Sequence, residues 1–168
     1  IVLVTGEAGL GKSRLTSEWR AGLPPDKIAV LTGETLSYGR ATSYQIFVRM
    51  LQRYFGLGEV EKPEAALDRV RQRLEALDPD LLDTSLPQLA NLLGLPLSDL
   101  ARQRLSRLEP EQVRQQTFLA LRSLFAGIAS GRPLLLILED LHWADELSLE
   151  LVLFLINLVQ QAPVVICG

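Results

Sequence analysis

The chain has 168 residues, of which 48% are hydrophobic and 22% are charged, and it carries a net charge of −3 at pH 7. This balance is typical of one globular domain with a sizeable core and argues against a disordered chain. Apolar runs such as residues 133–138 are far shorter than the roughly 20 residues of a membrane-spanning helix. The negative charge provides no general attraction to nucleic acid. We therefore expect a cytoplasmic protein that binds neither membranes nor nucleic acid directly.

Two residue types occur once and exclude two kinds of structure. Cys167 is the only cysteine, so no disulfide forms within the chain, and its apolar neighbours predict a buried, unreactive thiol. His142 is the only histidine, and no cysteine lies near it in the sequence. This excludes a zinc site with the usual ligand spacing.

The first feature along the chain is a phosphate-binding loop. Residues 1–5 are apolar and predict a strand, and residues 6–13 follow with the P-loop pattern G-x-x-x-x-G-K-[ST]. Glycines let the backbone approach a phosphate more closely than a Cβ would allow. We predict that Lys12 reaches the outer phosphates and that Ser13, at a helix start, binds magnesium through its hydroxyl. The residues expected to contact the nucleotide are Gly6, Glu7, Ala8, Gly9, Leu10, Gly11, Lys12, Ser13 and Arg14.

A helix and a strand are expected after the loop. The helix should end at Gly22, before Pro24-Pro25. Leu15 and Trp19 lie four residues apart and so share one helical face, and we interpret Trp19 as an anchor in the core. Residues 28–31 predict a short buried strand.

The middle of the chain is predicted to be helical. Ser43 is expected to cap a helix that Gly56 closes, with an apolar side formed by Ile46, Phe47, Met50, Leu51 and Tyr54. Residues 57–109 are rich in Leu, Glu and Arg, and we interpret them as a helical insertion with helices at 63–77, 86–94 and 97–107. Apolar stripes at this period favour a subdomain packed on the main sheet. A substrate lid or a partner surface is the alternative.

The last third of the chain predicts an alternation of helices and strands. Pro110 and Gly131 bracket a long helix, and residues 134–138 form a continuously apolar run, as expected of a strand covered on both faces. Asp145 is expected to cap a helix that runs to about Gln161, before a strand at 164–167. Strands that alternate with helices indicate an α/β fold with a parallel sheet.

Two carboxylates follow the apolar strand, at Glu139 and Asp140. In a P-loop protein such a pair can hold magnesium and orient the attacking water. Ligands also gather at the carboxyl ends of parallel strands. Without the P-loop, a solvated turn would explain the pair as well. Beyond it, Trp143 is expected to pack on the turn, whereas His142 and Asp145 either touch the site or satisfy the turn and cap the next helix.

Several of these segments resemble one known group of proteins. Residues 6–15, Gly33-Glu34 with Ser37-Tyr38-Gly39-Arg40, and above all residues 138–145 (Leu-Glu-Asp-Leu-His-Trp-Ala-Asp) are similar to the AAA-related ATPase module of STAND signal-transduction ATPases. Such modules occur in large multidomain regulators, including LuxR-type transcriptional activators and proteins with class III adenylate cyclase or protein kinase domains. The P-loop indicates only the superfamily, whereas the string at 138–145 is more specific.

The resemblance implies a P-loop NTPase fold with three α/β/α layers and a parallel sheet in the order 5-1-4-3-2. In that numbering residues 1–5, 28–31, 134–138 and 164–167 are strands one to four, and strand five is missing. The family usually has two aspartates where this chain has Glu139 and Asp140. By position, Glu139 takes the magnesium side and Asp140 the water, but which carboxylate contacts the metal stays open.

The chain begins within a predicted strand and ends in another apolar run, so we expect residues 1–168 to be a partial ATPase domain from a larger multidomain protein. The resemblance places a sensing residue, a lid and a winged-helix domain beyond Gly168. The expected partners are ATP and ADP, other domains of the same chain and, in a nucleotide-dependent manner, further copies of the protein. Adenine specificity rests on the resemblance alone.

These features together predict a switch domain of a signalling or transcription regulator that binds ATP with Mg²⁺ and hydrolyses it slowly. Lys12, Glu139 and Asp140 are the predicted catalytic residues, and Ser13, Glu139 and Asp140 the predicted metal ligands. One alternative is a scaffold that retains nucleotide without turnover, because Glu139 replaces an aspartate. Another is a P-loop small-molecule phosphotransferase, although residues 142–145 do not match those kinases. A GTPase is disfavoured because the chain contains no Asn-Lys-x-Asp string.

Overall fold

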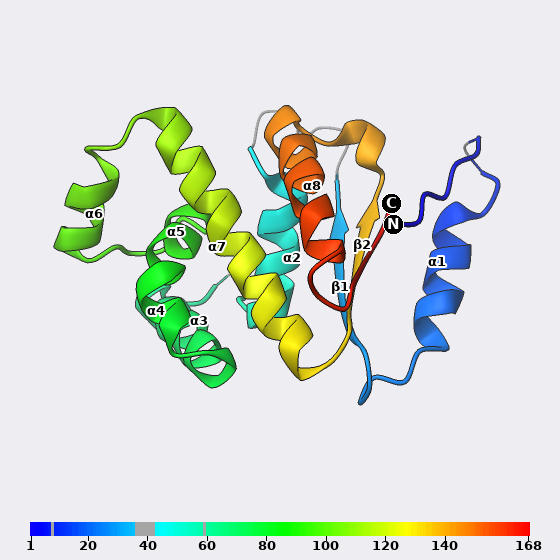
Figure 1. Ribbon diagram of the computed structural model, residues 1–168, viewed down its shortest axis with the longest axis horizontal. Coiled ribbons are helices and arrows are strands. Elements are labelled where there is room, and N and C mark those ends of the chain that lie inside the picture. Colours follow the sequence, from blue (N-terminus) through cyan, green and yellow to red (C-terminus); the bar gives the residue numbers. More distant parts are fainter. Residues whose placement is uncertain (8, 36–42, 59) are drawn as a thin grey trace. The chain divides into compact units, whose positions relative to one another are not determined.

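The computed structural model describes residues 1–7, 9–35, 43–58 and 60–168 (Figure 1). The chain divides into two compact units. The first combines Ile1–Met50 with Ile128–Gly168 and holds the strands, and the second, Leu51–Gly127, is helical. Within the described ranges, no helix is both long and apolar enough to cross a membrane.

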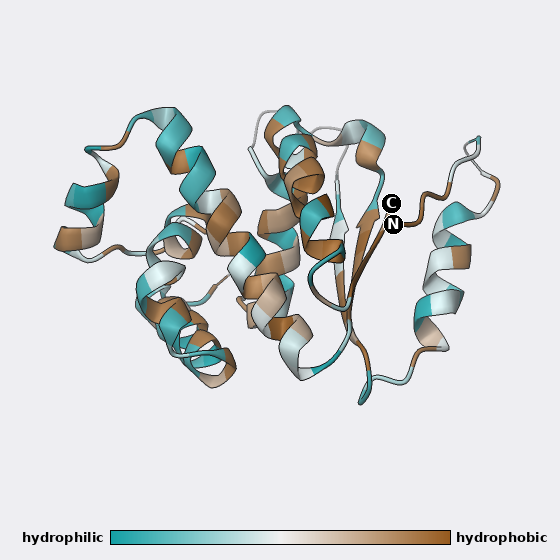
Figure 2. Cartoon of the chain, viewed as in Figure 1, coloured by the Kyte–Doolittle hydropathy of each residue, from teal (hydrophilic) through white to brown (hydrophobic). Residues whose placement is uncertain are grey.

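A parallel sheet forms the centre of the first unit. Its strands are β1 (Ala29–Glu34), β2 (Leu134–Glu139) and β3 (Val164–Cys167), in the order β1-β2-β3. Ala29 pairs with Leu134, which pairs in turn with Val164. Five of the six β2 residues are buried, and Figure 2 shows this strand as largely apolar. The predicted α/β class and parallel sheet are confirmed.

Residues 1–5 run beside β3 but do not form the regular strand that the sequence predicts. A single parallel bridge joins Val2 to Cys167. Val2 N–H donates to the Ile166 carbonyl at 2.8 Å, and Val4 N–H donates to the Gly168 carbonyl at 2.7 Å. Gly168 N–H donates in turn to the Val2 carbonyl at 3.0 Å, and the side chains of residues 1–3 are exposed. The neighbours along the sheet are nevertheless those that the resemblance implies for strands one to four.

The helices of the first unit are α1 (Lys12–Ala21) and α8 (Glu146–Val159), with a short 3₁₀ helix, η1, at Leu141–Trp143. The prediction that Leu15 and Trp19 face the core is wrong, because their exposed fractions are 60% and 41%. Thr16 contacts β2 and Arg20 contacts β1. Since successive helical residues are turned by about 100°, residues 15 and 19 point away from that contact face.

Two helices begin in one unit and end in the other: α2 (Gln45–Phe55) and α7 (Pro110–Gly131). The predicted apolar side of α2 is buried at Ile46, Phe47, Met50 and Leu51. Its last buried residue is Phe55, whereas Tyr54 is only partly buried. Gly56 ends α2 with a φ of +65°, a conformation that favours glycine.

The second unit contains four further helices: α3 (Pro63–Leu77), α4 (Asp80–Thr84), α5 (Leu86–Leu92) and α6 (Asp99–Leu105). The helix predicted at 63–77 is confirmed. The helix predicted at 86–94 begins as predicted but ends two residues earlier, and the one predicted at 97–107 is two residues shorter at each end. The helix α4 is not predicted from the sequence, because its five residues are too few to show a helical period. Val70, Leu74 and Leu89 lie in the core of this unit.

Candidate functional site

The loop between residues 5 and 12 has the backbone that its glycines predict. Gly9 and Gly11 both have φ of +86°, and Gly11 is the N-cap of α1. A Cβ at either position would meet nothing within 4 Å, so glycine is required for its conformation rather than for space. Ala8, one of the predicted contact residues, lies outside the described residues.

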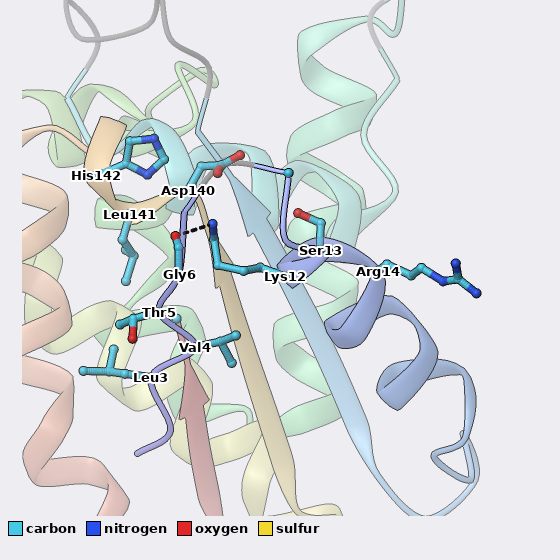
Figure 3. Close-up of a pocket in the computed structure, with 13 residues that line it drawn as sticks. Leu3, Val4, Thr5, Gly6, Lys12, Ser13, Arg14, Asp140, Leu141 and His142 are labelled. Carbon is cyan, nitrogen blue, oxygen red and sulfur yellow. Dashed lines mark hydrogen bonds between the residues drawn. The ribbon is translucent and has the colours of Figure 1, made fainter.

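Lys12 folds back over this loop. Its Nζ donates to the carbonyls of Gly6 at 2.8 Å and Glu7 at 2.9 Å, and Figure 3 shows the first of these bonds. The ammonium therefore lies at the inner side of the loop, next to the first turn of α1. The unpaired N–H groups and the partial positive charge of a helix N-terminus favour an anion at the same place.

A cleft of about 810 Å³ opens at the loop, a size that suits a small-molecule ligand. One wall carries Lys12, Ser13 and Arg14, and the other carries Asp140 and His142 (Figure 3). The structure thus brings together residues from two segments more than a hundred positions apart. The remaining lining residues are Leu3, Val4, Thr5, Gly6, Gly9, Gly11, Leu141 and Gly168.

The side chains of three predicted contact residues contribute little to the lining of the cleft. Leu10 is 71% exposed and is not among the residues lining the cleft. Glu7 contributes its backbone carbonyl, which accepts from Lys12. The Arg14 side chain points away from the cleft in Figure 3, and its Nε donates to Glu18 Oε1 at 2.8 Å.

The acidic pair lies at the carboxyl end of β2. Glu139 is the last residue of the strand, and Asp140 follows with a left-handed backbone (φ 57°, ψ 41°). Both residues line a smaller pocket of about 50 Å³ together with Lys12 and Ser13. The predicted lysine, hydroxyl and carboxylates therefore surround one space.

Two threonines that the sequence analysis did not identify contact this pair. Thr16 Oγ1 has two acceptors at similar distances, Glu139 Oε1 at 3.1 Å and the Ser13 carbonyl at 3.0 Å. Thr35 Oγ1 donates to the Asp140 carbonyl at 2.6 Å. Thr16 lies one helical turn after Ser13, and Thr35 directly follows β1 at the edge where β2 also ends. A search for hydroxyl residues at those two places would have found them.

Asp145 joins the beginnings of two helices. Its carboxylate caps α8 by accepting from Ser148 N at 3.0 Å and from Ser148 Oγ at 2.6 Å. It also accepts from the backbone N–H groups of Tyr44 at 3.0 Å and Gln45 at 3.2 Å, at the start of α2. Burial acts to raise the pKa of this carboxyl, but these hydrogen bonds together hold it below its ordinary value. The predicted cap is confirmed, and the contact with α2 is additional.

Of the two alternatives for His142, the structure agrees with the one in which it touches the site, whereas Trp143 is more exposed than predicted. His142 lines the cleft, and its ring centroid is 5.2 Å from that of Trp143. Trp143 is 36% exposed, so it packs on the turn only in part.

The oxygen atoms at this site suit magnesium rather than a transition metal. The described part of the chain contains no cluster of three or more His, Cys, Asp or Glu residues that could hold an ion. Ser13, Glu139 and Asp140 offer one hydroxyl and two carboxylates around the smaller pocket. Magnesium is commonly held by one or two carboxylates, with waters and substrate phosphates completing its shell, so the residues fit this ion.

Comparison with known proteins identifies the family. The sequence profile of the AAA ATPase domain matches residues 1–167. The chain is also 27% identical over 168 residues to uncharacterized protein R02095 of Rhizobium meliloti (strain 1021), covering 99% of the chain and 16% of that relative. The chain thus spans about a sixth of the relative's length. No solved structure gives a significant match. The match over nearly all of its length shows that this chain belongs to the AAA ATPase domain family.

Proposed function

We propose that this chain is an ATP- and Mg²⁺-binding switch domain that hydrolyses ATP slowly within a larger signalling or transcription regulator of the STAND type. The observation that carries the proposal is the shared cleft, which places Lys12 and Ser13 opposite Asp140. Family membership supports nucleotide binding. The small share of the relative that the chain covers supports a role inside a multidomain protein. A cytoplasmic location follows from the need for ATP.

Each predicted residue has a distinct task in this proposal. The N–H groups of the loop and of α1 bind the phosphates, and Lys12 exchanges its bonds to Gly6 and Glu7 for phosphate oxygens, where it stabilises negative charge. Asp140 orients the attacking water. Ser13 and Glu139 hold magnesium, which when bound neutralises charge on the outer phosphates. Thr16 keeps the Glu139 carboxylate directed toward α1 through their hydrogen bond.

The switch would act through nucleotide-dependent contacts with other domains of the chain or with further copies of the protein. We propose residues 1–168 as a partial ATPase domain of a larger protein, with residues 57–109 as its helical insertion. The helices α3 to α6 support this division, since all four lie between positions 57 and 109.

The test uses the purified protein with ATP and magnesium. Nucleotide affinity is measured with a fluorescent ATP analogue, and phosphate release is followed in a single turnover. Lys12→Ala should weaken binding strongly, whereas Asp140→Asn should keep binding and slow release. Lys27→Ala, which changes an exposed lysine outside the loop, is the matched control. Equal binding by wild type and Lys12→Ala would refute the proposal, and competition by GTP as strong as by ATP would refute adenine specificity.

A scaffold that retains nucleotide without turnover is the second candidate. It is favoured by Glu139, whose carboxylate accepts a hydrogen bond from Thr16 and is one methylene longer than the aspartate usual in the resembling family. Tight retention of ATP with no phosphate release would support this candidate. Release that depends on Asp140 would exclude it.

A further inference from the structure

Asp140 has an unusual backbone conformation for a residue with a side chain. Among the residues that the structure describes, Asp140 and Tyr44 are the non-glycine residues with positive φ. Left-handed backbone is unfavourable for such residues because the Cβ approaches the carbonyl oxygen, and it persists only where surrounding contacts hold it. Aspartate tolerates the conformation better than most residues do. A contact that holds the turn at Asp140 is therefore to be expected.

Thr35 provides that contact. Its side chain is buried, with 5% exposure, and its hydroxyl donates to the Asp140 carbonyl at 2.6 Å, with the Glu139 carbonyl a longer second acceptor at 3.3 Å. The Asp140 carbonyl also accepts from Trp143 N–H at 2.9 Å. The peptide unit that follows Asp140 is thus held from two sides.

The position of Thr35 follows from the sheet. The ladder between β1 and β2 ends at the pair Glu34 and Glu139, so Thr35 and Asp140 are the residues that follow the last pair on the two strands. The backbone turns away from the strand direction at Asp140, so the backbone ladder stops. Beyond the ladder, the Thr35 hydroxyl joins the two segments by donating to the Asp140 carbonyl. Asp140 lies at this turn, beside the cleft that it lines together with Lys12 and Ser13 (Figure 3).

We infer that Thr35 is a positioning residue for the hydrolytic reaction, acting through the Asp140 backbone. The inference rests on the proposed function, in which Asp140 orients the attacking water. Without the hydroxyl, the Asp140 carbonyl keeps only its bond to Trp143 N–H, so the turn adopts other backbone conformations more often and the carboxylate spends less time at the water. Displacements of about 1 Å from a reacting group cost on the order of 100-fold in rate. Nucleotide affinity should change little, because Thr35 does not line the cleft at the loop.

Thr35→Val tests the inference, because valine has nearly the same shape without the donor. In the intact protein, we expect about a 10- to 100-fold loss in the single-turnover rate, with unchanged affinity for the ATP analogue. Thr35→Ser keeps the donor and should restore the rate. Thr117→Val is the control, since Thr117 is also buried and donates to a backbone carbonyl, that of Val113 at 2.9 Å, in the second unit. If Thr35→Val does not fold, Thr35→Cys, with its weaker donor, replaces it.

A double-mutant cycle shows whether Thr35 acts through Asp140. In the Asp140→Asn background, Thr35→Val should cause little further loss, because the group that it positions is no longer functional. The full loss in both backgrounds would overturn the inference, and so would a wild-type rate in Thr35→Val alone.

Hydrogen exchange separates this inference from the proposed function, because it requires no turnover. Thr35→Val should increase deuterium uptake in residues 139–145, most of all at the Trp143 amide, whereas Thr35→Ser should match wild type. An inactive wild type would refute the proposed function, and exchange would then show by itself whether Thr35 holds the turn. Unchanged uptake in Thr35→Val would overturn the inference.

Discussion

The carboxylate of Asp145 accepts hydrogen bonds from the first turns of two helices, so its removal should destabilise the first unit more than the loss of one cap does. Replacing an N-cap aspartate with alanine costs about 1 kcal/mol for one helix, which gives about 2 kcal/mol for α8 and α2 together. The Ser148 side chain is fully buried, and a buried hydroxyl that loses its partner adds about 1 kcal/mol. We therefore expect Asp145→Ala to lower the free energy of unfolding by about 3 kcal/mol.

Urea denaturation followed by tryptophan fluorescence measures this difference, because Trp19 and Trp143 both lie in the first unit. Asp26→Ala removes an exposed carboxylate of the same unit and should change the unfolding free energy by less than about 0.5 kcal/mol. A loss for Asp145→Ala as small as that for Asp26→Ala would refute the reasoning. It would show that water replaces the carboxylate at both helix starts without cost.

The same carboxylate makes a prediction about pH. Because hydrogen bonds lower the pKa of Asp145 in the folded chain, its ionised form is more stable there than in the unfolded chain. The stabilisation is fully present above the unfolded pKa, which is about 3.9, and is lost as the pH falls through the lower folded pKa. The stability difference between wild type and Asp145→Asn should thus stay constant near neutral pH and decrease below about pH 4. A difference that instead grew in acid would contradict the assigned direction.

Two further predictions concern the packing of the sheet. A Cβ at Gly33 would lie 2.7 Å from both Cγ1 and the carbonyl oxygen of Ile46. Gly33→Ala should therefore lower the free energy of unfolding by about 1–3 kcal/mol in urea denaturation. Gly131→Ala is the control and should not lower it, because a Cβ at Gly131 would meet nothing within 4 Å. Burial, and to a lesser degree the negative charge of Glu139, raise the pKa of the Cys167 thiol, which is 1% exposed. Its alkylation by iodoacetamide at neutral pH should therefore be slow until urea unfolds the sheet, and rapid labelling of the folded chain would show that β3 is accessible.

The sequence predicts elements well where one local pattern determines them. The continuous apolar run at 134–138 predicts β2, and proline and glycine predict both ends of α7. Predictions fail where the partner lies far along the chain. β1 extends to Glu34, past the predicted end at residue 31, because Thr32, Gly33 and Glu34 pair with the last residues of β2. Trp19 was assigned to the core from its spacing alone, but the bonds of Thr16 and Arg20 determine which face of α1 contacts the sheet.

The residues of the candidate site likewise divide into those that a local sequence pattern predicts and those whose role depends on a distant partner. The P-loop pattern and the acidic pair predict Lys12, Ser13, Glu139 and Asp140, and the structure brings these residues to one pocket. Thr35 carries no motif of its own. Its contact with Asp140 depends on the register of β1 against β2 and on a left-handed residue after β2, and neither is visible in the order of the amino acids.

Two carbonyl oxygens of the loop accept hydrogen bonds from Lys12, so in the proposed function phosphate binding by Lys12 is an exchange of partners. The ammonium already donates hydrogen bonds to its own loop, at the carbonyls of Gly6 and Glu7. In the proposed function, the contribution of Lys12 to nucleotide affinity is therefore the difference between its bonds to phosphate oxygens and its bonds to these carbonyls, and not the full strength of a lysine–phosphate contact. It follows that Lys12→Ala removes a cross-link of the unliganded loop as well as a ligand contact, and that backbone mobility at residues 6 and 7 should rise even in the absence of nucleotide.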